Sequence, residues 1–158
     1  MWNKKLIFAL ILLFTGCGPI APPSLTEAEV QEFVRQYVVA QNEGDASKAM
    51  ELTSRETNVS SVVEGKIDRG WEAIRESTDK NIASSSRFRL VAGTVIVTVL
   101  SSDTALAVAP MVRTPISGSA IFDVSGAFTM IIRRSPEGLR LVHEHYSMSP
   151  PTPVLFGR

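Results

Sequence analysis

The sequence predicts an α+β fold in which helices pack on one face of a curved antiparallel sheet. In the first half of the chain, apolar residues recur at the spacing of amphipathic helices. From residue 88 onward, β-branched and alternating segments dominate, and short turns that join antiparallel neighbours separate them. Because the helices come first and the strands follow as a meander, the two kinds of element segregate into layers, which is typical of the α+β class.

Three helices are expected before the meander. The first begins after Thr26, whose hydroxyl can cap the helix while Glu29 completes a capping box. Gly44 is its stop signal, and Asp45 caps a short second helix. A third helix begins around Gly70 and carries its own apolar stripe. These signals place all three helices in the N-terminal half.

One short strand is expected among the β-branched residues at 53–65, between the second and third helices. Four longer strands follow the third helix, and Ser, Asp, Pro and Gly residues form the turns between them. Their expected ranges are 89–100, 105–112, 119–134 and 139–147.

The composition excludes several classes of protein. The chain has 158 residues, 44% hydrophobic and 20% charged, which is too apolar for a disordered chain. Sixteen Lys and Arg against 16 Asp and Glu provide no basic footprint for nucleic acid. One Cys permits no intrachain disulfide or cysteine-rich metal site, and the sequence has no glycine-rich phosphate loop. We therefore expect no nucleic-acid partner, metal site or cofactor.

The first 17 residues have the anatomy of an export signal. Lys4 and Lys5 precede the apolar run 6–14, which is too short to span a membrane as a helix. The run ends in Thr15-Gly16-Cys17, which resembles the lipobox of bacterial lipoproteins. The resemblance implies cleavage before Cys17 and lipidation of that residue, which would anchor the protein to the membrane. An ordinary secretory signal with an incidental Cys17 is the alternative.

The expected location is the cell envelope. Gly18 follows Cys17 where an acidic retention residue would otherwise stand, which favours the outer membrane, facing the periplasm, if the source is Gram-negative. The expected organisation is a signal peptide at 1–16, a lipidated Cys and Pro-rich tether at 17–24, one domain at 25–148 and a Pro-rich tail at 149–158.

Several motifs resemble the SnoaL-like branch of the nuclear-transport-factor-2-like superfamily over residues 25–148. They are Asn42-Glu43-Gly44-Asp45 after the first helix, Gly70-x-Glu72-Ala73-Ile74-Arg75 at the third and His143-x-His145-x-Ser147 in the last strand. The resemblance implies a cone-shaped sheet wrapped on three helices, a pocket at its wide end and a homodimer formed through the sheet. It does not imply one activity, because this fold supports many.

The two histidines are the first candidates for chemistry. His143 and His145 stand two apart on a predicted strand and therefore share a face, while Glu144 and Tyr146 point to the other. Either histidine could act as general acid/base, the pair could help to hold a metal, or both could be structural; a pair with no identified partner favours the structural interpretation. Asp123 is a third catalytic candidate, because a charge between apolar neighbours is costly to bury unpaired.

Five residues are candidates for lining a ligand pocket. Tyr37 and Trp71 lie on helical apolar stripes that border the pocket in the resembled fold, with core packing as the alternative. Phe128 and Met130 share one face of a long strand. Arg113 could recognise an anionic ligand, because guanidinium groups match carboxylates geometrically.

Two functions stay open at this point. The favoured one is a membrane-anchored domain that binds a small apolar or amphipathic ligand, or a protein partner, without catalysis. The alternative is a small lyase, isomerase or cyclase that uses His143 or His145 as general acid/base in the cone pocket, with Asp123 or Tyr37 orienting it. No carboxylate base of the steroid-isomerase type is identifiable from the sequence.

Overall fold

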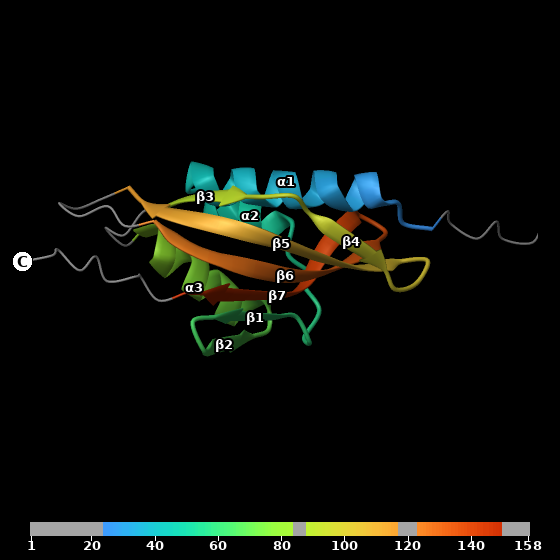
Figure 1. Cartoon of the computed structure of the whole chain (residues 1–158). Helices are drawn as coiled ribbons and strands as arrows, with labels where there is room; N and C mark the ends of the chain where they lie inside the picture. The colour runs from blue at the N-terminus through green and yellow to red at the C-terminus, as the bar shows by residue number, and fades with distance from the viewer. Residues whose placement is uncertain (1–23, 84–87, 117–122, 150–158) are drawn as a thin grey trace, which may run out of the picture.

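Three helices and one seven-stranded sheet make up the computed structural model, which describes residues 24–83, 88–116 and 123–149. In Figure 1 the long strands cross the front of the view, and α1 runs beside β3. The helices are α1 (Glu27–Glu43), α2 (Ala46–Glu51) and α3 (Trp71–Ala83). The strands are β1 (Ser60–Val63), β2 (Lys66–Arg69), β3 (Phe88–Ala92), β4 (Ile96–Val99), β5 (Thr104–Pro115), β6 (Val124–Ser135) and β7 (Gly138–Met148).

The sheet has the order β2-β1-β7-β6-β5-β3, and β4 pairs with the first part of β5. All pairs are antiparallel except β1 with β7, which is parallel. β1 and β7 are far apart in the sequence, so the long connection between them allows a parallel pair. The predicted α+β class, with a curved sheet against N-terminal helices, is confirmed.

The helix signals read from the sequence are confirmed. Thr26 and Glu29 form the capping box of α1, Gly44 ends it in a left-handed conformation with φ of 67°, and Asp45 caps α2. The buried stripe of α1 packs on the sheet, so local capping and tertiary packing agree on where this helix lies. Its members are Val30, Phe33, Val34, Tyr37 and Ala40.

The capping box is joined to the far end of β6. Arg134 donates from Nη2 to Glu29 Oε1 at 2.9 Å, and this bond, followed by those from Thr26, lowers the pKa of Glu29 to about 2. An acid whose pKa is lower in the folded than in the unfolded chain stabilises the fold above the unfolded value, here 4.5, and loses that contribution as the pH falls toward 2.

Glu29→Gln is therefore expected to lower the melting temperature at pH 7, and the difference from wild type should shrink as the pH falls from 4.5 toward 2. Thermal unfolding at several pH values measures this. Glu27→Gln, which removes a charge from the same turn but leaves the Arg134 pair intact, is the control. A difference that stays constant with pH would contradict the assignment.

The prediction of a single strand at 89–100 is wrong, because the region forms two separate strands, β3 and β4, with an interruption between them. Gly93 donates its N–H to the Pro110 carbonyl at 2.8 Å, and a Cβ at Gly93 would meet Pro110 Cγ at 2.9 Å. β3 and β4 consequently pair with different halves of β5. The short strand expected at 53–65 is present as β1, and residues 119–122 of the expected third long strand lie outside the described residues.

The expectation also missed β2, which forms a hairpin with β1. Glu64 and Gly65 both adopt positive φ, 51° and 82°, as two-residue hairpin turns of the I′ type require. Glu is an unusual residue at such a position, which explains why the turn was not predicted.

A β-bulge in β7 decides which of its residues face the helices. Ile131 pairs with His143, but its neighbour Ile132 pairs with Leu141, so Val142 is an extra residue on β7. Leu141 and Glu144 are therefore both buried, although strict alternation would place them on opposite faces. The bulge thus turns Glu144 toward the helices, and His143 and His145 away from them.

Candidate functional site

A cavity of about 80 Å³ lies between the sheet and the helices α1 and α3. One part of its wall is apolar and includes Phe88, Leu90, Met111 and Met148. The other part is polar, with side chains from β1, β2, β5, β7 and α3. Its polar members include Ser61, Asp68, Ser77, Thr78, Arg113 and Glu144.

Glu144 forms the buried polar floor of this cavity and is only 5% exposed. Tyr37 Oη donates to its Oε2 at 2.8 Å, and Ser61 Oγ donates to its Oε1 at 2.7 Å. Burial raises the pKa of Glu144, and hydrogen bonding from Ser61, Tyr37 and Tyr146 opposes that rise without cancelling it. The site therefore favours the neutral carboxyl more than water does.

The two tyrosine hydroxyls beside Glu144 remain protonated over the physiological range. Burial, followed by the nearby Glu144, raises the pKa of both Tyr37 and Tyr146 well above its ordinary value. Both are consequently hydrogen-bond donors rather than phenolate bases. The floor is thus a network of protonated hydroxyls around one carboxyl.

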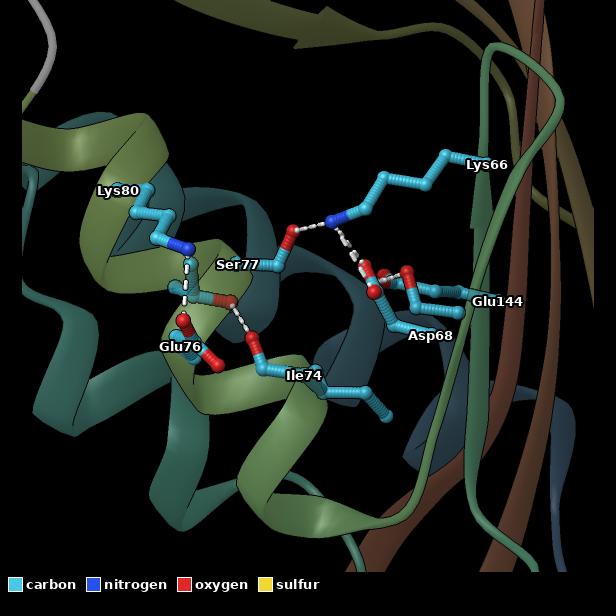
Figure 2. Close-up of polar contacts among 9 residues, drawn as sticks. Lys66, Asp68, Ile74, Glu76, Ser77, Lys80 and Glu144 are labelled. Atoms are coloured by element: carbon cyan, nitrogen blue, oxygen red, sulfur yellow. Dashed lines mark hydrogen bonds and ion pairs between the residues drawn. The ribbon is translucent and has the colours of Figure 1, made fainter.

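Sheet register explains how this network assembles. Ser61 on β1 stands opposite Asp68 on β2 and Glu144 on β7, so three polar residues form a row across neighbouring strands. Lys66 Nζ lies 3.0 Å from Asp68 Oδ1 and 2.8 Å from Ser77 Oγ on α3. Figure 2 shows Lys66 reaching across to Ser77, with Asp68 and Glu144 beside this bridge. The β1–β2 hairpin is thereby tied to α3 beside the cavity.

Arg113 contributes a half-buried positive charge to the wall. Its guanidinium carbon lies 3.7 Å from the centroid of the Phe88 ring, and its Nη1 lies 3.8 Å from Met148 Sδ. Its carboxylate neighbour is Glu64, whose Oε1 lies 3.7 Å from Arg113 Nη1. Burial lowers the pKa of Arg113, but an arginine stays charged over the physiological range.

Of the five predicted lining residues, the structure places Arg113 in the cavity wall and Tyr37 behind its floor. Phe128 and Met130 are fully buried in the hydrophobic core and do not line the cavity. Trp71 lies at a separate surface groove, where the guanidinium carbon of Arg55 lies 4.3 Å from the centroid of the Trp71 ring. Core packing, the alternative given for Tyr37 and Trp71, therefore also describes Phe128.

None of the three predicted acid/base candidates lies against the cavity. His143 Nδ1 is 2.9 Å from Ser60 Oγ, and His145 is exposed, both on the face opposite Glu144. Burial and the neighbouring His145 lower the pKa of His143. Asp123 is exposed and accepts a hydrogen bond from Thr114. The structure does not bring the histidines together with Asp123 or Tyr37.

Ser61, Asp68 and Glu144 line the cavity, but the sequence pattern did not predict them as site residues. The available signal was the pair of tyrosines, Tyr37 in a helical apolar stripe and Tyr146 in the last strand, because a buried phenol needs a partner.

In the described part of the chain, no group of three His, Cys, Asp or Glu side chains could hold a metal ion. None of the helices described is long and apolar enough to cross a membrane.

A curved, open sheet packed against three helices is the fold of solved nuclear-transport-factor-2-like structures. More narrowly, the chain belongs to the SnoaL-like domain family, whose profile matches residues 30–151. No curated protein is significantly similar to the chain in sequence.

Solved structures share this fold at low sequence identity. A nuclear-transport-factor-2-like protein of Salmonella enterica superposes with a TM-score of 0.69 at 20% identity, over 83% of this chain and 96% of that one. A Streptomyces avermitilis protein described as a candidate dehydratase has a TM-score of 0.69 at 18% identity, covering 77% and 95%.

A third solved structure, from Xanthomonas campestris, is described as a candidate association domain of calcium/calmodulin dependent protein kinase II. It gives a TM-score of 0.68 at 18% identity and covers 84% of this chain and 95% of that one. Names that range from an enzyme to an association domain show that the fold does not determine the function.

Proposed function

We propose that this domain binds a small amphipathic molecule in the cavity without catalysing a reaction. The observation that carries the proposal is the division of the cavity wall, where apolar side chains such as Leu90 and Met111 meet a floor formed by Glu144. Concave sites that combine apolar walls with a few fixed polar groups are typical of small-molecule binding.

The state of the floor favours binding over catalysis. A general base needs an ionised group that can take a proton from the ligand. Both oxygens of Glu144, however, already accept hydrogen bonds from this chain's own hydroxyls. Neither histidine lines the cavity. These contacts suit a floor that positions a polar group of the ligand.

The size of the cavity limits the ligand. An apolar cavity of about 150 Å³ admits benzene, and the cavity here is about 80 Å³. The chain of a four-carbon alcohol is therefore a suitable probe, and butan-1-ol is chosen for its neutral head group.

Thr78→Phe should weaken butan-1-ol binding at least about ten-fold, because Thr78 lines the cavity and a ring there would fill it. Glu76→Phe, on the exposed side of the same helix, is the matched control and should bind like wild type. NMR titration of the folded variants measures the affinities. Equal binding by both variants would place the ligand elsewhere.

We further propose that the protein is exported and anchored through lipidated Cys17, which lies outside the described residues. The support is the lipobox-like ending of its N-terminal apolar run. Localisation in the envelope and homodimerisation stay predictions.

Cys17→Ser should move the protein from the membrane fraction to the soluble fraction and abolish acylation, because the acyl chains supply the membrane affinity. Fractionation with metabolic acyl labelling measures both effects, and Gly18→Ser is the control. A Cys17→Ser protein that is still acylated and membrane-bound would refute the anchor.

A further inference from the structure

We propose that the ligand of this cavity is a short-chain monocarboxylate whose carboxylate pairs with Arg113. The inference rests on the proposed binding function and names the chemical class of the ligand. It depends on where Arg113 stands in β5, on the weakness of its present partner and on the charge state of the other polar groups in the wall.

Arg113 continues the inward face of β5 into the cavity. The residues before it on that face are fully or almost fully buried and apolar, and they end with Met111. Side chains at alternate positions share a face, so Arg113 points inward as well. Its side chain is 24% exposed and packs against Phe88 and Met148. A guanidinium is thus held at the end of an apolar series.

The present partner of Arg113 balances this charge poorly. Glu64 Oε1 lies 3.7 Å from Nη1, beyond normal hydrogen-bond length, and the Glu64 side chain is 63% exposed. Ion pairs as exposed as this one contribute little free energy of stabilisation. Because the pKa of Arg113 is lowered chiefly by burial, the nearby charge of Glu64 does not offset the loss of solvent. A ligand carboxylate can displace Glu64 and bind the guanidinium with two parallel hydrogen bonds.

The other charged groups of the wall do not compete for this role. Asp68 in the wall is paired with Lys66 at 3.0 Å, and both oxygens of Glu144 accept hydrogen bonds from Ser61 and Tyr37. Among the described lining residues, Arg113 is therefore the charged group without a close partner of opposite charge, and an anion fits it better than an ammonium ion. The alkyl chain of the ligand would lie against the apolar wall formed by Leu90 and Met111.

Three probes of equal chain length test the inference on the full-length protein at pH 7: butyrate, butan-1-ol and butylammonium. Titration followed by NMR should give butyrate at least about ten-fold tighter binding than butan-1-ol, with butylammonium the weakest. Arg113→Gln should abolish the preference for butyrate over butan-1-ol.

Glu64→Gln is the matched variant with the opposite expectation. Removing the competing carboxylate should strengthen butyrate binding several-fold and leave butan-1-ol unchanged. Because Glu64 is exposed in a turn, this variant tests the inference even if Arg113→Gln fails to fold.

The outcomes separate the inference from the proposed function. If butan-1-ol binds in the cavity but butyrate binds no better, or if the preference survives Arg113→Gln, the carboxylate assignment is overturned and the binding function stands. Unchanged butyrate affinity in Glu64→Gln likewise overturns it. If none of the three probes binds, the proposed function fails together with the inference.

Discussion

Glu144→Ala is expected to lower the free energy of unfolding by about 3 kcal/mol, because it leaves the buried hydroxyls of Tyr37, Ser61 and Tyr146 without their shared acceptor. Glu144→Gln keeps an acceptor oxygen and the side-chain volume, so it should cost about 1 kcal/mol or less. Urea denaturation of both variants measures the difference. If Gln were as damaging as Ala, the charge of Glu144 rather than its hydrogen bonds would hold the floor together.

The stabilities of wild type and Glu144→Gln should depend differently on pH. The pKa of Glu144 is higher in the folded than in the unfolded chain, so the neutral carboxyl contributes stability below the unfolded value of 4.5, and this contribution is lost as the pH rises through the folded pKa. Wild type should therefore lose stability relative to Glu144→Gln when the pH is raised above 4.5. A parallel pH dependence of the two would show that burial does not shift this group.

Phe128→Ala is expected to cost about 3–5 kcal/mol of unfolding free energy, the cost of an unfilled space at a large buried aromatic residue. Phe128 is 0% exposed, and its ring centroid lies 6.1 Å from that of Tyr146. Phe128→Leu, which refills part of the space, should cost markedly less. Urea denaturation provides the values, and a loss below about 1 kcal/mol for Phe128→Ala would contradict its place in the core.

Phe128 also tests how the core and the cavity divide their roles. The sequence predicted it as a lining residue, whereas the structure places it behind the wall. A folded Phe128→Leu protein should therefore bind butan-1-ol within about two-fold of wild type. A large loss of affinity would show that the packing of Phe128 on Tyr146 sets the shape of the floor.

The parts of the fold that could be predicted from the sequence are those set by local chemistry. Thr26, Glu29 and Gly44 define the ends of α1 through contacts within a few residues, so pattern and structure agree. The break at Gly93 depends instead on Pro110, a residue of another strand. The pattern of β-branched residues continues through that break and therefore gave one strand where there are two.

The polar floor was missed for a similar reason. Glu144 and Tyr146 were correctly placed on the face opposite His143, but which face is inward depends on the extra residue Val142. A bulge exists only in the pairing of two strands, and it reverses the sense of every residue beyond it. Sequence alternation alone therefore could not tell which set of side chains entered the cavity.

The parallel pairing of β1 with β7 has a consequence for the order in which the domain forms during synthesis. The β1–β2 hairpin is made early, but a two-stranded hairpin is marginally stable alone, and β7, the strand it joins, is the last strand among the described residues. Ser61 and Glu144 are separated by 83 positions, so this contact closes a long loop. A nascent chain that ends before β7 can hold α1 against β3, β4 and β5, but it lacks Glu144 and with it the polar floor of the cavity. The polar floor of the cavity is therefore completed only when β7 is in place.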